Sequence, residues 1–589
     1  EEPLKQAIEA APEAATPWLA LVTYYVRVGR SREAEQVLNE AVARLAADPP
    51  HLVPLTLARG YELLDDNDRA AKEYRRAVAA SPDDVGLRIL AADFFTRTGQ
   101  FEKAGEHLRW LTDPDHAAPE FAVRWAQRRQ AMIVAAGGAY NDTLRALQLL
   151  REARSRRGHV TPDDLRAEAA ILAKRNTRRD KLDRIRIYQQ IAEQQPLEPD
   201  EQFTLARLYE ETGDWEQARE QMTALLREYG DRVLYVAWWA EALLRHEGPD
   251  EAELWVERAR ALDGETLTTT FLTARLLVAR GRKTEAVTAL RDFLNRQQPL
   301  GPDPATREQL RKLLLAGEEQ LPRAVHVFGE YVKTTKDANA RRVLAAVQER
   351  LAESNPDAAY SQLRRFMEST DLAIGVHADR LRESGRLLEE LGLADQAEQF
   401  YRRYVEVSVR PEAHLEMAAY LGRQGRIAEA LDLCESLDGR VPQDRIAGMM
   451  VSLARRDAAT EADRKRVETH LAEAVRSAPD DSRLLMHLAA LRDLQGDYDE
   501  AARLFQAILQ TDSRNVQALN NLAWLLAVHF GKPHEALPLI ERAIEIAGPQ
   551  PVLLDTRAEV HLALNDVQQA VDDLLEATAQ MDVPEFRLH

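Results

Sequence analysis

The sequence predicts an all-α protein, built as a solenoid of repeated helix pairs, and three observations carry this prediction. A unit of two short amphipathic segments joined by a turn recurs along the 589-residue chain. Turn and helix markers keep a fixed spacing from copy to copy. One helix pair cannot bury its apolar stripes alone, so it needs neighbours of the same kind.

Residues 482–515 contain the clearest copy of this unit. Its first half has leucines at helical spacing, including Leu485 and Leu488, which place one apolar stripe on a helix. Gly496 then interrupts the pattern where a sharp helix–helix reversal needs a backbone that tolerates positive φ. The second half carries another stripe, which includes Phe505. The copy therefore predicts a helix, a glycine turn and a second helix.

In copy after copy, the turn glycine is separated by the same number of residues from a small residue of the helix that follows it. An alanine follows the glycine by five residues at Gly29/Ala34, Gly99/Ala104, Gly213/Ala218, Gly281/Ala286, Gly392/Ala397, Gly425/Ala430, Gly496/Ala501 and Gly531/Ala536. Asn565/Ala570 repeats the step with asparagine, which tolerates left-handed geometry next best. Adjacent copies are 33 to 35 residues apart, as from Ala501 to Ala536.

This pattern resembles the tetratricopeptide repeat in its bacterial multi-repeat form. The matching residues are a small one in the first helix (Ala489), an aromatic one that opens the second (Tyr498), and then Ala501 and Phe505. The resemblance implies a right-handed α-α superhelical solenoid of about sixteen helix pairs, spaced roughly 36 residues apart against about 34 in the family.

The repeats predict a single continuous solenoid over residues 1–589. Regular blocks cover 1–111, 200–295, 381–437 and 470–589, whereas 112–199, 296–380 and 438–469 are looser. We expect longer loops near 113–120, 297–306 and 370–374 to absorb the extra residues. The N-terminal residues match the second helix of a repeat whose first helix is missing. Residues 583–589 match the start of the first helix of a further repeat. We therefore expect the chain to be a segment of a longer protein.

Composition narrows the classes of partner. The formal net charge is −19, which argues against non-specific binding to nucleic acid or to an anionic membrane. The single cysteine, Cys434, excludes an intrachain disulfide and a cysteine-rich metal site, and its spacing predicts a helix-core position. No apolar run is long enough to span a membrane, so we expect no direct insertion. The compartment, cytoplasmic or periplasmic, and the oligomeric state stay open.

No catalytic or cofactor signature is present in the sequence. There is no H-E-x-x-H motif, no G-x-S-x-G motif and no phosphate-binding glycine loop. His529 and His534 are five residues apart, which is off the face that a helical metal pair needs. We therefore expect no catalytic residues, no metal site, no cofactor and no enzymatic activity.

The first candidate binding surface lies in the block that starts at residue 199. In the repeat family the first helix of each pair lines the concave wall, where peptides bind. Carried over by register, the inward positions include Phe203, Arg207, Trp238, Phe271 and Arg275. Successive aromatic residues with interleaved arginines have the composition that binding hot spots favour. The alternative is that Phe203, Trp238 and Phe271 pack between adjacent helices.

A second candidate surface comprises His487, Asn520, Asn521 and Trp524. The segment 520–523 is similar to repeats that hold a peptide backbone through an inward asparagine. The equivalent positions of neighbouring copies are not asparagine, so a continuous ladder is absent and the class of peptide stays open.

A basic stretch, 151–186, carries twelve Lys/Arg and six acidic residues, a net of +6 inside an acidic chain. Its centre, Arg175, Arg178, Arg179 and Lys181, is a candidate docking patch for an acidic partner. The alternative is a solvated helix face that pairs with acidic neighbours.

These features predict a non-catalytic scaffold that binds partner proteins or peptides on the concave face of the superhelix. Two alternatives remain. The chain could be the substrate-selecting repeat region of a larger enzyme, such as a glycosyltransferase. It could also be a periplasmic repeat component of a polysaccharide secretion or export apparatus.

Overall fold

The computed structural model describes residues 1–46, 48–155, 160–175 and 177–580. Within these ranges the chain forms 32 α-helices, a few short helical turns of other types and no strand. The all-α prediction is therefore confirmed. Residues 583–589, which we expect to begin another helix, lie outside the described ranges.

The first helices are α1 (Glu2–Ala10), α2 (Ala15–Arg27), α3 (Ser31–Arg44), α4 (Leu52–Leu63), α5 (Asn67–Ala80), α6 (Val85–Arg97), α7 (Phe101–Thr112), α8 (Glu120–Ala135), α9 (Tyr140–Ser155), α10 (Pro162–Leu172) and α11 (Arg178–Gln194). The middle helices are α12 (Pro199–Glu211), α13 (Trp215–Tyr229), α14 (Val233–His246), α15 (Pro249–Asp263), α16 (Leu267–Ala279), α17 (Lys283–Arg296), α18 (Pro304–Leu315), α19 (Leu321–Thr334), α20 (Ala338–Ala352) and α21 (Pro356–Glu390). The last are α22 (Ala394–Val407), α23 (Ala413–Arg423), α24 (Ile427–Glu435), α25 (Gln443–Ala454), α26 (Glu461–Ser477), α27 (Ser482–Leu494), α28 (Tyr498–Thr511), α29 (Val516–Trp524), α30 (Pro533–Ala547), α31 (Pro551–Ala563) and α32 (Val567–Ala579).

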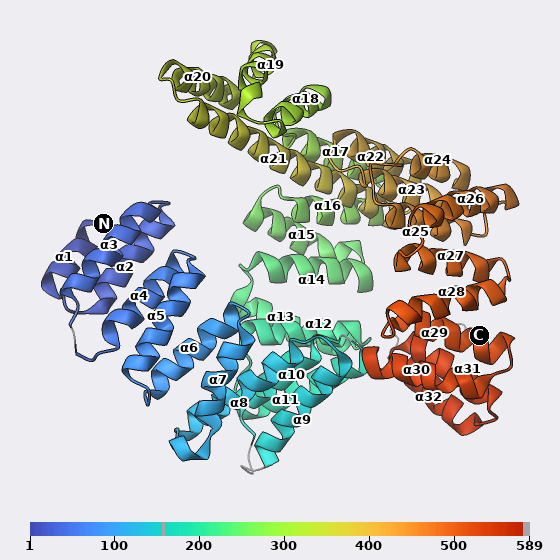
Figure 1. The fold of residues 1–589 in the computed structure, drawn as a ribbon, viewed down its shortest axis with the longest axis horizontal. Helices are drawn as coiled ribbons and strands as arrows, with labels where there is room; N and C mark the ends of the chain where they lie inside the picture. Colours follow the sequence, from blue (N-terminus) through green and yellow to red (C-terminus); the bar gives the residue numbers. More distant parts are fainter. Residues whose placement is uncertain (47, 156–159, 176, 581–589) are drawn as a thin grey trace. The chain divides into compact units, whose positions relative to one another are not determined.

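Successive helices form the pairs that the sequence predicts (Figure 1). Helix α4 packs on α5, α14 on α15 and α27 on α28. First helices of neighbouring pairs also meet, as α14 meets α16 and α25 meets α27. Each pair thus buries its stripes against the next one, as a stacked repeat requires.

The turn and helix markers have the geometry that the repeat needs. All eight turn glycines have positive φ, from 61° at Gly531 to 91° at Gly213, and Asn565 has a φ of 64°. A side chain is disfavoured in this region, which explains the glycines. The eight alanines that follow them are 0% exposed. Neighbouring helices therefore approach too closely at these points for a larger side chain.

The chain divides into two compact units. Unit 1 comprises Glu1–Glu201, Glu541–Ala558 and Val571–His589, and unit 2 comprises Gln202–Ile540 and Glu559–Ala570. Each unit has several apolar cores, and each core joins more than one helix pair. In unit 1, for example, one core runs from Ile8 to Leu57. The prediction of one continuous solenoid stays a prediction.

Helix α21 corrects one expected loop. We expected a loop near 370–374, but these residues lie inside α21, which is 35 residues long. Its first half packs Leu363 and Phe366 into the core of α18–α20, and its second half packs Leu381 and Leu388 into the next core. The expectation is wrong because the stretch has no residue that stops a helix, and each end of α21 has a core of its own to bury.

Unit 1 also contains a contact between segments far apart in the chain. The side-chain amide of Asn141, at the start of α9, donates to the backbone oxygen of Glu545 at 3.0 Å, across 404 positions. Beside it, Gly548 has a φ of 86°, and a side chain there would meet the ring of Tyr140 at 2.4 Å. Only glycine lets the α30–α31 connection lie this close to the ring.

We expect cysteines placed at positions 141 and 545 to be joined by a short bifunctional thiol reagent in the folded protein. The natural Cys434 is buried and does not compete for the reagent. Peptide mapping of the cross-linked chain checks this result. A control pair at positions 103 and 545 should stay unlinked, and equal cross-linking of both pairs would contradict the contact.

Candidate functional site

A groove lies between α8 and α10, two first helices of unit 1. Its volume is about 340 Å³. Residues at i, i+3, i+4 and i+7 of each helix line it, so each set is one stripe on its helix. The lining residues are Trp125, Arg128, Arg129 and Met132 of α8, and Asp163, Arg166, Ala167 and Ala170 of α10.

The floor of the groove offers apolar area. Trp125 and Met132 are half-buried, so part of each side chain faces the groove. Phe121, one turn before Trp125, is 65% exposed. The Arg129 guanidinium lies 5.5 Å from the centre of the Trp125 ring. Aromatic residues, methionine and arginine are the residues enriched in protein interfaces.

Carboxylates of neighbouring helices hold the arginines of the rim. Arg129 pairs with Asp93 at 2.8 Å, and Arg166 pairs with Glu201 at 2.6 Å. Arg128 pairs at 3.2 Å with Asp164, which is buried. These pairs fix long side chains that would otherwise lose rotamer entropy when a partner binds.

The Asp164 carboxylate is ionised in spite of its burial. Desolvation raises its pKa, but hydrogen bonds from Thr161 and Arg128, together with the charge of Arg128, outweigh this and hold the pKa below its usual value. The rim therefore keeps its charge pattern at neutral pH.

Sequence reasoning missed this groove because it falls in the looser block 112–199. The repeat markers are weak there, so the repeat register assigns no inward positions in this block. The signal was nevertheless present: Phe121, Trp125 and Met132 share one helical stripe with Arg128.

The structure places Phe203 in the core rather than in a groove. Its ring is 6% exposed and lies 4.8 Å from the ring of Tyr235 and 5.5 Å from that of Trp238. The packing alternative therefore holds for Phe203. Trp238 beside it is half-buried and keeps some exposed ring. Successive first helices approach closely at this point, and the Phe203 and Trp238 rings fill the space between them.

The other residues of the first candidate surface are held by ion pairs or by a core, and are therefore less available to a partner than the repeat register predicts. Arg207 is exposed but pairs with Glu211 at 3.6 Å. Arg275 lies 2.9 Å from Glu390 and 3.8 Å from Glu241. Phe271 is half-buried and packs against a different core from that of Phe203. The structure does not gather the three aromatic rings, and a partner-binding role for this surface stays a prediction.

The residues of the second candidate surface lie in unit 2, His487 on α27 and the other three on α29. The Asn520 amide donates to the Asn521 side-chain oxygen at 3.2 Å. The Asn520 side-chain oxygen is buried and has no hydrogen-bond partner among the described residues. Trp524 follows one turn later, and its ring meets that of His529 edge-on at 4.9 Å. An amide oxygen without a donor is suited to a backbone N–H of a peptide.

His487 of this surface is held against the preceding repeat. A Cβ at Gly448 of α25 would lie 3.0 Å from its ring, so the glycine makes room for the imidazole. Burial lowers the pKa of His487, and the nearby Asp444 opposes this effect only in part. The ring is therefore neutral at pH 7.

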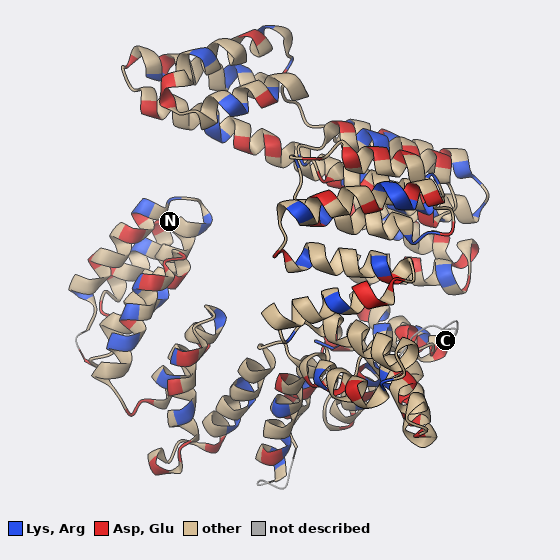
Figure 2. Ribbon diagram, turned by 45° about the vertical axis from the view of Figure 1, so that its right-hand side comes forward, with Lys and Arg blue, Asp and Glu red and all other residues tan. Residues whose placement is uncertain are grey.

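The predicted basic patch is largely dispersed. Lys181 is only 5% exposed, because it shares the buried stripe of α11 with Ile185. Arg175 pairs with Asp180 at 3.3 Å, and Arg178 is half-buried. Arg179 is exposed and lies 4.0 Å from Glu576. Across the described helices, acidic and basic residues are interspersed (Figure 2). The alternative of a charged face with acidic neighbours describes this stretch better than a continuous patch.

Two features are absent from the described residues. They contain no group of three or more His, Cys, Asp or Glu side chains placed to hold a metal ion. None of their helices combines the length and apolar character that a bilayer crossing requires. The predictions of no catalysis and no cofactor stay predictions.

Comparisons with known proteins agree with the repeat. A family model described as tetratricopeptide repeat matches residues 55–118, 203–266, 468–514 and 495–551, and another with the same description matches 411–436. No curated protein sequence matches the chain.

Solved structures of low identity are also similar to the chain. One is a tetratricopeptide repeat protein from Parabacteroides merdae, with 16% identity over 41% of this chain and 92% of that chain, at a TM-score of 0.28. Another is a thermophilic tetratricopeptide repeat protein from Thermus thermophilus, with 24% identity over 32% of this chain and 99% of that one, at a TM-score of 0.25. A third is the structure of Naa15/Naa10 bound to HypK-THB, with 12% identity over 90% of this chain and 94% of that one, at a TM-score of 0.31.

Proposed function

Because the chain is a tetratricopeptide repeat protein, we propose that it is a non-catalytic scaffold that binds a partner protein or peptide in the groove between α8 and α10. Repeats of this family are in general protein-interaction modules. The observation that carries the proposal is the stripe of Trp125 and Met132 exposed between ion-paired arginines.

The groove combines the two properties that make a binding hot spot. An apolar floor supplies surface whose removal from water favours association. The rim of Arg128, Arg129 and Arg166 supplies donors that are already oriented. A partner segment with an apolar side chain as anchor and backbone or side-chain acceptors on either side fits this arrangement.

The surface of Asn520, Asn521 and Trp524 is the second candidate position for a partner. Its free amide oxygen favours an extended backbone rather than an apolar anchor. The two surfaces lie in different units. Each has one half-buried tryptophan, so a tryptophan-to-alanine substitution tests each of them.

We expect Trp125→Ala to weaken partner binding by about 2 kcal/mol or more, because the indole supplies most of the apolar contact area in the groove. A displayed peptide library selected on the wild-type chain provides the ligands, and calorimetry gives Kd for each variant. Circular dichroism should show unchanged helicity, since the ring is only half-buried.

Trp524→Ala is the matched control. If it weakens binding and Trp125→Ala does not, the partner binds on α29 and the groove assignment is wrong. Selected peptides that bind both variants as tightly as the wild type would exclude both surfaces.

A further inference from the structure

We infer that unit 1 has a separate site for an oxyanion, a phosphate group carried on a small molecule or a lipid headgroup, in the cavity beside Lys174 and Thr143. The site does not depend on the partner groove. It lies between the first turn of α9, Lys174 and Arg175 after the end of α10, and the α30–α31 connection.

The cavity has a volume of about 420 Å³, within the range of small-molecule sites. The charged side chains that line it are Lys174 and Arg175, and no carboxylate of the described residues does so. The residues from Ala547 to Pro551 also line the cavity. A cavity lined only by positive charge is unexpected in a chain with a net charge of −19.

Lys174 is exposed at the edge of the cavity, and its charge has no counter-ion among the described residues. Its ammonium donates to the backbone oxygen of Ala135 at 3.1 Å, and no carboxylate pairs with it among the described residues. Arg175 is partly compensated, because it pairs with Asp180 at 3.3 Å and lies over the ring of Tyr140 at 4.6 Å. The uncompensated positive charge in the cavity is therefore that of Lys174.

Thr143 supplies an independent sign of a ligand. Its side chain is only 3% exposed and lines the cavity, and the structure shows no hydrogen bond from its hydroxyl to another described residue. The hydroxyl is not one of the fully enclosed polar atoms, so it borders the space of the cavity, where water or a ligand can be its partner. An oxyanion at this position would accept from the Thr143 hydroxyl and from the Lys174 ammonium together, and such charge-assisted bonds are strong.

Carboxylates close to the cavity are occupied elsewhere. Asp142 accepts from the backbone N–H of Ala139 at 3.3 Å, and Asp180 accepts from the Thr177 hydroxyl at 2.5 Å. An adjoining cavity of about 440 Å³ also contains Arg175, but there four carboxylates balance four arginines. Of these two adjoining cavities, only the one lined by Lys174 and Arg175 has a net positive charge that favours an anion.

The test measures binding of glycerol 3-phosphate to the full chain by calorimetry, with inorganic sulfate as a second soluble probe. Vesicles of phosphatidic acid in a neutral lipid form the lipid arm. We expect one of the two phosphate sources to bind, and the arm that binds identifies the source. Binding should weaken as ionic strength rises.

Thr143→Val and Lys174→Gln are each expected to weaken binding by about tenfold, since each removes one charge-assisted hydrogen bond. Thr143→Val keeps the shape of the side chain, so it tests the hydroxyl even if Lys174→Gln perturbs the end of α8. Lys72→Gln is the matched control: it removes one exposed lysine of α5 in the same unit and should bind like the wild type.

Two results would overturn the site. One is the absence of binding to every probe at millimolar concentration. The other is equal binding by the wild type, Thr143→Val and Lys174→Gln, which would place the anion elsewhere on the chain.

Discussion

Tyr401→Ala is expected to lower the stability of the region around α21–α23 by about 3–5 kcal/mol, as for other large buried rings. Tyr401 is 0% exposed, and its ring packs 4.9 Å from that of Tyr420. On the other side a Cβ at Gly385 would lie 3.3 Å from the ring, so the helices are fitted closely around it. Hydrogen exchange of α21–α23 measures the loss where it occurs, because a repeat protein opens locally.

Two further variants distinguish the contribution of the Tyr401 ring to stability from that of its hydroxyl and from the effect of changing an exposed side chain. The Tyr401 hydroxyl donates to Glu389 at 3.1 Å, and Glu389 also pairs with Arg423 at 2.7 Å. Tyr401→Phe should therefore cost only about 1 kcal/mol. Leu254→Ala removes a side chain that is 67% exposed in the same unit and should change little. A loss for Leu254→Ala as large as for Tyr401→Ala would contradict this account.

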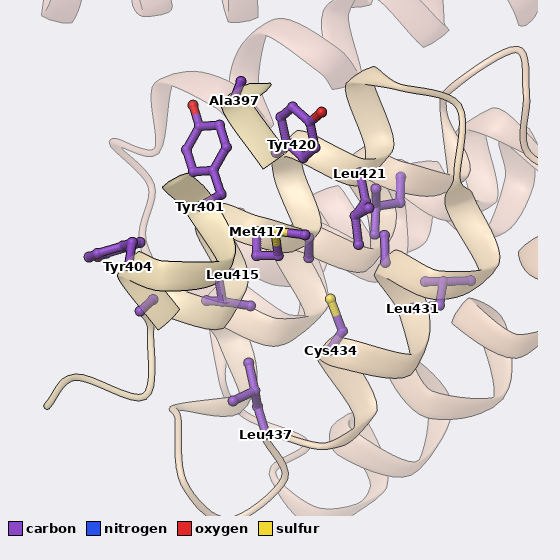
Figure 3. Close-up of a cluster of buried hydrophobic side chains, with 14 of the residues drawn as sticks. Ala397, Tyr401, Tyr404, Leu415, Met417, Tyr420, Leu421, Leu431, Cys434 and Leu437 are labelled. Carbon is purple, nitrogen blue, oxygen red and sulfur yellow. The ribbon is translucent and has the colours of Figure 1, made fainter. Parts of the chain in front are cut away.

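Cys434 is expected to react with a thiol reagent about a thousandfold more slowly in the folded chain than in urea. Burial raises the pKa of the Cys434 thiol to about 12. At pH 8 only about one thiol in ten thousand is then ionised, and the thiolate is the reactive form. Figure 3 shows Cys434 among Met417, Leu421 and Leu437. The residue is 0% exposed, so a reagent has no access to the thiol in the folded chain.

The rate of Cys434 labelling, followed by mass spectrometry at increasing urea, reports the opening of the surrounding repeats. The expected sign follows from the raised pKa: labelling of the folded chain accelerates as pH rises toward 12. Rapid stoichiometric labelling without denaturant at pH 8 would show that the thiol is accessible and would refute the core position. The tight packing around Ala430, at 0% exposed, argues against that result.

The repeat register was predictable wherever a local rule is strict. The step from Gly496 to Ala501 combines a backbone that must have positive φ with a helix contact that has no room for a side chain. Both requirements lie within a few residues, so the sequence states them directly. The core position of Cys434 followed from the same register.

The exposure of individual side chains was harder to predict. Phe203 and Trp238 occupy similar positions of successive first helices, yet Phe203 is buried and Trp238 is half-buried. Lys181 looked like a surface cation by composition but follows the buried stripe of its helix. Both outcomes depend on how closely the next helix approaches, which no local pattern specifies.

The sequence by itself determined the helix-pair fold, the turn positions and the small residues where helices touch. Only the tertiary structure decided which side chains face a groove, that residues 370–374 continue a long helix, and that Lys174 and Thr143 share a cavity with residues 547–551. The physical reason is the distance along the chain over which each effect acts. Helical periodicity acts over one or two turns of chain, whereas burial and ion pairing depend on segments brought together from positions as far apart as Asn141 and Glu545.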